Sequence, residues 1–159
     1  MITRRAQHAA REGIVTAIGN TWRATLAVAG TLALMGLASA QDLSPYRKGG
    51  IITTFKAVVD HYNTTGERFR INGECKSACT MFLGIRNVCV EPSARLYFHA
   101  GHAVGDRQHM LAGPTTAMMS QYNDALQSFV SGNGYMTKPE FSVITGSDLI
   151  KKFGYRSCK

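Results

Sequence analysis

The sequence lacks internal repeats, low-complexity tracts and long runs of charge of one sign. Without repeats, nothing points to an array of small stacked units. The formal net charge is +8. After residue 40 the net charge falls to about +5, and basic residues there never extend beyond pairs such as Lys151-Lys152. Nucleic-acid binding therefore has little support, because it calls for a clustered basic surface.

An uninterrupted apolar run of the roughly 20 residues that span a bilayer is also absent. Residues 1–40 instead combine a basic leader, an apolar stretch over residues 24–37 and Ala38-Ser39-Ala40, which suits cleavage before Gln41. They predict a secretory signal peptide whose removal leaves no stable membrane span, so we expect an exported protein, periplasmic or secreted. An uncleaved membrane anchor is the alternative. No cysteine follows the apolar stretch, which argues against a lipoprotein.

All four cysteines lie after this leader, at Cys75, Cys79, Cys89 and Cys158. An even set in an exported chain indicates disulfides rather than free thiols. Because the intervening helix must pack back on its neighbouring strand, we expect Cys89 to pair with one of the two cysteines before it and Cys158 to take the other. The competing interpretations are a zinc site at Cys75 and Cys79, and Cys79 as a buried core residue.

The hydrophobic pattern predicts an α/β fold in a single domain over residues 41–159. Apolar residues spaced three and four apart predict helices, and alternating stretches predict strands. Strands separated by helices imply parallel crossovers, so the expected architecture is a short, mainly parallel sheet with flanking helices. The expected helices cover residues 51–65, 77–83, 118–130 and 148–153, the expected strands cover 69–71, 88–90 and 96–99, and a loop covers 99–114.

The segment Gly-Glu-Cys-Lys-Ser-Ala-Cys-Thr at residues 73–80 carries the clearest functional signal. An apolar run follows it, and His99 lies at the end of the next predicted strand. A serine where a strand turns into a helix, with a histidine at the end of the following strand, can hold a hydroxyl nucleophile beside a base. The pattern favours a serine hydrolase in which Ser77 and His99 react together.

Four features follow one another along the chain: Gly49-Gly50 before a helix, Ser77 after a strand, Pro92, and His99. In order and approximate spacing they resemble the proteolytic subunit of Clp protease and the wider crotonase-like superfamily. The chain is also similar to a group of small exported bacterial proteins of unknown function, which share the Gly-x-Cys-x-Ser-Ala-Cys-Thr signature and a Phe-His-Ala segment. The resemblance implies a pared-down Clp/crotonase-like fold.

The same resemblance implies a role for each residue of the site. Ser77 would be the nucleophile and His99 the base that takes its proton, and the backbone amides of Gly50 and Ala78 would form the oxyanion hole. Glycine lets the backbone approach a reacting carbonyl closely, and amides at a helix start face developing negative charge. The substrate would be a peptide or another acyl compound such as a thioester, with no cofactor and no metal.

Two features depart from the superfamily pattern. Residues 140–146, where the protease has the aspartate of its triad, contain no aspartate, so Glu140 or Asp148 would have to take that role. The strands that precede the diglycine in the superfamily are missing as well. A shortened sheet leaves an open edge, so we expect the N-terminal segment, a partner chain or a second copy of this chain to cover it.

The same residues also have other interpretations. Ser77 can serve as a helix N-cap, or form a serine–lysine dyad with Lys76. The group His99, His102 and His109 can bind a metal or form a loop of solvated histidines. The missing aspartate and the shortened sheet also favour a second function, a non-catalytic exported binding protein that holds a peptide on the edge of a degenerate hydrolase fold.

Overall fold

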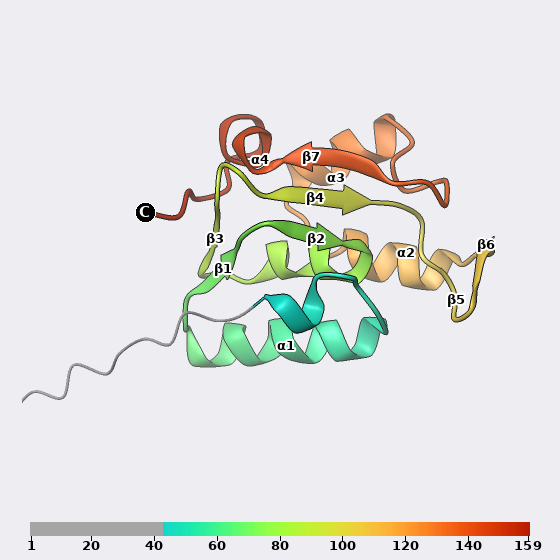
Figure 1. Cartoon of the computed structure of the whole chain (residues 1–159), viewed down its shortest axis with the longest axis horizontal. Helices are drawn as coiled ribbons and strands as arrows, with labels where there is room; N and C mark the ends of the chain where they lie inside the picture. The colour runs from blue at the N-terminus through green and yellow to red at the C-terminus, as the bar shows by residue number, and fades with distance from the viewer. Residues whose placement is uncertain (1–42) are drawn as a thin grey trace, which may run out of the picture. The chain divides into compact units, whose positions relative to one another are not determined.

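Short strands and helices alternate in the computed structural model, which describes residues 43–159 (Figure 1). The predicted signal peptide over residues 1–40 lies outside the described residues. In chain order, with η for a 3₁₀-helix, the elements are η1 (Ser44–Tyr46), α1 (Ile52–Thr65), β1 (Phe69–Ile71), β2 (Glu74–Lys76), η2 (Ser77–Gly84), β3 (Val88–Val90), β4 (Arg95–Phe98), β5 (His102–Ala103), β6 (Asp106–Met110), α2 (Ala112–Met119), α3 (Asp124–Gly132), β7 (Ser142–Thr145) and α4 (Gly146–Phe153).

The strands of this part of the chain form three small sheets. β1 pairs with β3 in parallel, β5 and β6 form a hairpin, and the central sheet has the order β2-β4-β7. Figure 1 shows α1 below these strands and α4 above them, next to β7. The predicted α/β class is confirmed. The central sheet is less parallel than expected, because β7 runs antiparallel to β4 while β2 runs parallel to it.

Helix α1 forms because its apolar residues recur on one face. Phe55, Val59 and Tyr62 are buried, and burying a side chain of this kind stabilises the fold by about 2 kcal/mol. Gly66 ends the helix in a left-handed conformation, φ 73°, and its N–H donates to the Tyr62 carbonyl at 3.0 Å, as predicted. The packed helix holds the turn before it, at Gly49-Gly50, against the rest of the domain.

Helix η2 passes through the centre of the hydrophobic core. Its residues 78–83 are all buried. The Phe82 ring packs against Phe55 and Phe69, with ring centroids 5.3 and 4.6 Å apart. The helix predicted here is present in the tighter 3₁₀ form, and it begins at Ser77 directly after β2. Ser77 therefore sits at the boundary between the central sheet and the core.

The single helix predicted over residues 118–130 is wrong. Two helices cover this region, because the Asn123 side chain accepts a hydrogen bond from the Leu126 N–H at 3.0 Å and starts a new helix. The loop predicted over residues 99–114 is also wrong in part. It contains the β5–β6 hairpin, and because residues 104–110 are all exposed, no buried alternation marks those strands.

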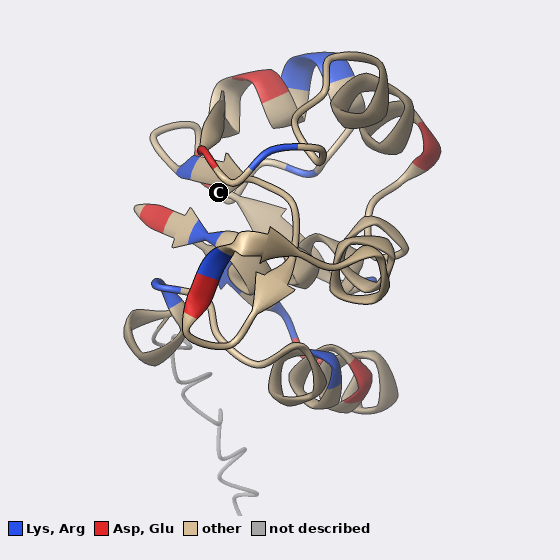
Figure 2. Cartoon of the chain, turned by 90° about the vertical axis from the view of Figure 1, so that its right-hand side faces the viewer, with Lys and Arg blue, Asp and Glu red and all other residues tan. Residues whose placement is uncertain are grey.

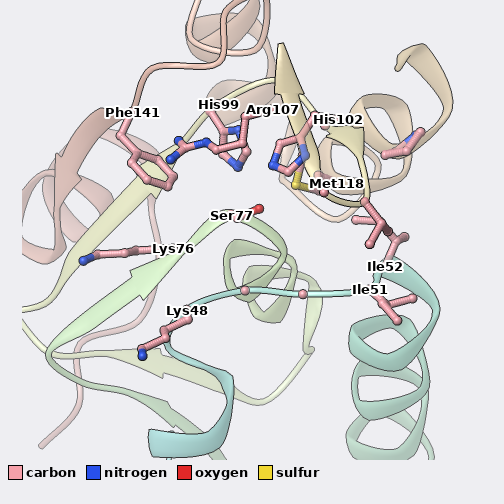
Figure 3. Close-up of a pocket in the computed structure, with 16 residues that line it drawn as sticks. Lys48, Ile51, Ile52, Lys76, Ser77, His99, His102, Arg107, Met118 and Phe141 are labelled. Carbon is pink, nitrogen blue, oxygen red and sulfur yellow. The ribbon is translucent and has the colours of Figure 1, made fainter. Parts of the chain in front are cut away.

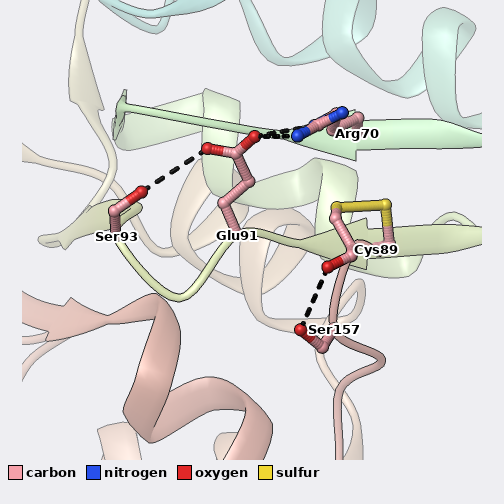
Figure 4. The surroundings of a disulfide bond; sticks show 6 residues. Arg70, Cys89, Glu91, Ser93 and Ser157 are labelled. Atoms are coloured by element: carbon pink, nitrogen blue, oxygen red, sulfur yellow. Dashed lines mark hydrogen bonds and ion pairs between the residues drawn. A yellow bond between two sulfur atoms is a disulfide. The ribbon is translucent and has the colours of Figure 1, made fainter.

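The predicted disulfide framework is confirmed, but the predicted pairing is wrong. Cys75 bonds to Cys79, and Cys89 bonds to Cys158 (Figure 4). The C-terminal tail runs beside β3, where the Val90 N–H donates to the Arg156 carbonyl at 2.8 Å and the Cys158 N–H donates to the Val90 carbonyl at 3.0 Å. This pairing brings Cys158 to Cys89. Cys75 and Cys79 then meet across the start of η2, with their Cα atoms 5.3 Å apart.

Two disulfides are compatible with the predicted export, since such bonds persist in oxidising compartments. Within residues 43–159, no helix has the length and apolar character that crossing a membrane requires.

Candidate functional site

A cavity of about 430 Å³ opens at the end of β2. Five parts of the chain line it: the turn at residues 48–52, the junction of β2 and η2, the stretch from His99 through the β5–β6 hairpin, helix α2 with Pro114 and Met118, and Phe141 ahead of β7 (Figure 3). The structure brings Ser77, His99 and Gly50 to this one cavity. Ala78 is fully buried and is not among the residues that line it.

Ser77 has an unusual backbone conformation. Its φ is 56°, and it is the one non-glycine residue with positive φ among residues 43–159. A left-handed conformation costs an L-residue about 1 to 2 kcal/mol, and such strain is concentrated at functional turns. The N-cap position of η2 belongs to Lys76 and no side chain caps this helix, so Ser77 does not act as the predicted alternative, an N-cap. The serine hydroxyl faces the cavity (Figure 3).

Hydrogen bonds and a disulfide hold this strained residue. The Thr80 hydroxyl donates to the Ser77 carbonyl at 2.8 Å and lies 2.6 Å from the Tyr122 hydroxyl, which must donate to it. The Cys75–Cys79 disulfide closes a small ring with Ser77 at its centre, and both cysteines are fully buried. The left-handed conformation is thus enforced from both sides of Ser77.

The diglycine turn lies against the serine. A Cβ on Gly49 would come within 2.7 Å of the Ser77 Cβ and 3.2 Å of the Ala78 nitrogen, so no larger residue fits there. The N–H groups of Gly50 and Ala78 donate to no other residue in the described part of the chain. Unpaired N–H groups near a serine hydroxyl are suited to hold negative charge that develops on a carbonyl oxygen.

His99 is 1% exposed, and neither of its ring nitrogens has a hydrogen-bond partner among residues 43–159. Its ring packs edge to face on Phe141, with centroids 4.9 Å apart, and lies 5.4 Å from the ring of His102. Burial, and after it the charges of His102 and Arg107, lower the pKa of His99 to about 4. The imidazole is therefore neutral at pH 7 and can accept a proton. The prediction of a loop of solvated histidines is wrong for this residue.

The hydroxyl and the imidazole share a cavity without being hydrogen-bonded to each other. Figure 3 shows the Ser77 hydroxyl below the rings of both His99 and His102. The His102 Nδ1 lies 2.8 Å from the Ala103 carbonyl oxygen, which can only accept, so Nδ1 carries the proton and Nε2 is free to accept one. Catalytic hydrogen bonds are often long without substrate, so either imidazole is a candidate base.

A third catalytic carboxylate is not found beside His99, because no aspartate or glutamate of residues 43–159 hydrogen-bonds to its ring. Asp148 is engaged elsewhere: it pairs with Lys152 at 2.9 Å and accepts from the Thr145 hydroxyl at 2.8 Å, contacts that lower the pKa of its carboxyl. Glu140 is exposed. Neither residue orients the His99 imidazole.

Lys76 is placed as a cation rather than as a base. Its ammonium pairs with Glu74 at 2.9 Å and lies over the Tyr97 ring at 4.9 Å. The hydrogen bond to Glu74 raises the pKa of Lys76, which is the opposite of what a serine–lysine dyad needs. Figure 3 shows the Lys76 amine directed away from Ser77.

The alternative metal sites find no support in the geometry. Cys75 and Cys79 are joined to each other, so neither offers a thiolate to zinc. His109 is exposed on β6. In residues 43–159, no three His, Cys, Asp or Glu side chains gather in a group that could hold a metal ion.

Sequence reasoning missed three residues of the cavity wall that are distant from the Ser77 signature. Lys48, Arg107 and Phe141 reach the cavity through the turn before α1, the β5–β6 hairpin and the segment before β7. No local pattern signals them, because tertiary folding alone brings them together.

No family model matches the chain, and no curated protein or solved structure is significantly similar to it.

Proposed function

We propose that this protein is an exported serine hydrolase that cleaves an acyl bond, with a pared-down Clp/crotonase-like domain. The observation that carries the proposal is the left-handed backbone of Ser77, which a turn would avoid by using glycine, at the edge of a cavity that also contains a buried, neutral histidine. Strained serines at strand-to-helix turns present their hydroxyl for nucleophilic attack.

In the proposed reaction the Ser77 Oγ attacks the substrate carbonyl while an imidazole takes the hydroxyl proton. The oxygen of the tetrahedral intermediate becomes negative and receives a hydrogen bond from the N–H group of Gly50, which lines the cavity; such a bond is worth about 3 kcal/mol in the transition state. The imidazolium then protonates the leaving group, and water releases the acyl group from Ser77 by the reverse sequence.

We assign the role of general base to His99, and His102 is the alternative base. His99 lines the cavity, and its ring nitrogens have no hydrogen bond that must break before the imidazole accepts the hydroxyl proton. Because no carboxylate orients it, the proposed catalysis is that of a dyad. Triad hydrolases lose several orders of magnitude in rate when their carboxylate is neutralised, so we expect slow turnover.

The lack of an orienting carboxylate favours a second candidate function, a binding protein in which the cavity and the open edge of β7 hold a peptide without cleaving it. Val143 on β7 is 37% exposed and Phe141 before it is 39% exposed, so apolar side chains lie along this edge. A peptide can add to such an edge through main-chain hydrogen bonds.

A fluorophosphonate probe at pH 8 separates the two functions. We expect the probe to label the protein after removal of residues 1–40, and to fail on Ser77→Ala. The matched control is Ser93→Ala, which removes an exposed hydroxyl outside the cavity and should leave labelling unchanged. A labelling rate that falls at least tenfold in His99→Gln but not in His102→Gln would assign the base. Absence of labelling in the wild-type protein would favour the binding function.

A further inference from the structure

The cavity has two unlike ends. Figure 3 shows Lys48 and Lys76 on one side of Ser77, and Ile51, Ile52 and Met118 on the other. The guanidinium of Arg107 lies above the serine, between Phe141 and His99. No aspartate or glutamate lines the cavity. The wall therefore combines a cationic end and an apolar end with the serine hydroxyl between them.

Two of these cations are available to a ligand. Lys48 is exposed and forms no ion pair among residues 43–159. Arg107 donates one hydrogen bond to the Pro139 carbonyl at 3.1 Å and lies over the Phe141 ring at 5.2 Å, contacts that position the guanidinium but leave its charge uncompensated. Lys76, by contrast, is already paired with Glu74.

The buried imidazole gives independent evidence for a ligand. His99 is almost completely buried with both nitrogens unpaired, which is costly in a native structure unless a bound group satisfies them. The charge of Arg107 also acts on this ring and contributes to lowering the pKa of His99. The positive potential of Arg107 thus extends to the position that a ligand beside His99 would occupy.

The apolar end is open enough to receive an acyl chain. Ile51 is 63% exposed and lines the cavity, so its side chain is accessible to a ligand. Met118, which is 1% exposed, lines the same side of the cavity, and a methionine side chain adapts its shape readily. Burying one methylene contributes about 0.8 kcal/mol in general, so several methylenes of a ligand give substantial selectivity.

We propose that the cavity takes acyl compounds with an apolar acyl group and an anionic group on opposite sides of the reacting carbonyl. The acyl group lies at the Ile51 end, and a carboxylate or phosphate lies beside the Arg107 guanidinium at the cationic end, with Lys48 at the outer rim of that end. The assignment of the carbonyl to Ser77 rests on the proposed hydrolase function, whereas the selection of an anion does not.

Equilibrium binding to Ser77→Ala tests the anionic end without any need for catalysis. Two matched ligands are titrated calorimetrically, 4-(hexanoylamino)benzoate and its neutral methyl ester. We expect the carboxylate to bind about tenfold more tightly at low ionic strength, and this ratio to fall as salt screens the cations. A third ligand, 4-(hexanoylamino)phenyl phosphate, shows which anion is preferred. Equal affinity for the acid and its methyl ester, with no gain for the phosphate, would overturn the proposal.

Variants then locate the anion. Arg107→Gln should remove most of the preference for the acid and Lys48→Gln a smaller part, while Lys151→Gln, which removes an exposed charge on α4 outside the cavity, should keep it. A preference that survives in both cavity variants would place the anion elsewhere and overturn the assignment.

The apolar end has its own test. Replacing the hexanoyl group by acetyl should weaken binding by at least tenfold, and Ile51→Ser should reduce the difference between the two ligands. If acetyl and hexanoyl ligands bind equally, the apolar end is refuted. Failure of the hydrolase proposal is seen separately, as absence of fluorophosphonate labelling in a protein that still prefers the anion.

Discussion

Gly49 and Ser77 are in direct contact across the cavity floor, so close that a single methyl group on the glycine would lie 2.7 Å from the serine Cβ and 2.7 Å from the Lys76 carbonyl oxygen. The contact joins the turn before α1 to the junction of β2 and η2, two segments that are separated along the chain. The position of the hydroxyl therefore depends on a residue that has no chemistry of its own.

Gly49→Ala should displace the diglycine turn from Ser77 and lower labelling by the fluorophosphonate at least tenfold. It should also reduce the free energy of unfolding by about 2 kcal/mol or more, since it adds a backbone clash to the strain of a positive φ. The matched control is Gly66→Ala, because Gly66 has a similar φ of 73° but nothing within 4 Å of its Cβ position. It should lose about 1 kcal/mol and keep labelling. Equal effects of the two variants would contradict the role of the contact.

The two disulfides should have separable effects. Replacing Cys75 and Cys79 by alanine together should release the backbone at Ser77 and lower labelling strongly. The stability loss should be only about 2 kcal/mol, because the loop that this bond closes is short. Labelling rates and denaturant unfolding of the double variant check both values.

Replacing Cys89 and Cys158 by alanine gives the matched comparison. This bond spans 69 residues, so its loss should reduce the free energy of unfolding by about 4 kcal/mol. At temperatures where the variant remains folded, labelling of Ser77 should stay near the wild-type rate. A larger loss of labelling here than in the other double variant would be inconsistent with a local role for Cys75–Cys79.

Thr80→Val should impair the site more than Tyr122→Phe does, although both break the same buried hydrogen bond of 2.6 Å. The valine also removes the donor to the Ser77 carbonyl, whereas the phenylalanine leaves that bond in place. Each change should cost about 1 to 2 kcal/mol of stability. The measurement is the labelling rate relative to the fraction folded, and similar rates in both variants would refute the link between Thr80 and Ser77.

His99 should make the protein less stable as the pH falls. The folded protein keeps this imidazole neutral down to about pH 4, while the unfolded chain takes up a proton below about pH 6.5. The unfolded state therefore binds more protons across this window, and the free energy of unfolding should drop by about 3 kcal/mol between pH 7.5 and pH 4.

The variant His99→Phe supplies the reference for this effect. It retains every other titrating group, so its loss of stability over the same pH range should be smaller than that of the wild-type protein by the same amount. Denaturant unfolding at both pH values measures the difference. Parallel pH dependence of the two proteins would show that His99 is not neutral in the folded state.

Part of this fold could be predicted from the sequence because the signal is local. The apolar spacing of α1, the stop at Gly66 and the buried run of η2 each follow from side chains that are near in the sequence. β2 and β7 could not be predicted. They have three and four residues and mixed burial, so neither shows the alternation that identifies a strand.

The disulfide pairing could not be predicted for a different reason. It depends on the tail running beside β3, a contact between residues far apart in the sequence. The candidate site also depends on contacts between residues that are far apart in the sequence. Ser77 was recognisable from the signature at residues 73–80 and His99 from its place at the end of a predicted strand, while Lys48 and Arg107 reach the cavity from a turn and a hairpin that carry no motif.

The left-handed backbone conformation at position 77 also affects which residues evolution would accept there. If the bend alone were useful, drift would replace the serine by glycine or asparagine, which tolerate that conformation more easily. Persistence of serine among divergent descendants of this chain would then indicate selection for the oxygen atom itself. The residues found at this position in an alignment of homologues would distinguish selection for the backbone conformation from selection for the hydroxyl group.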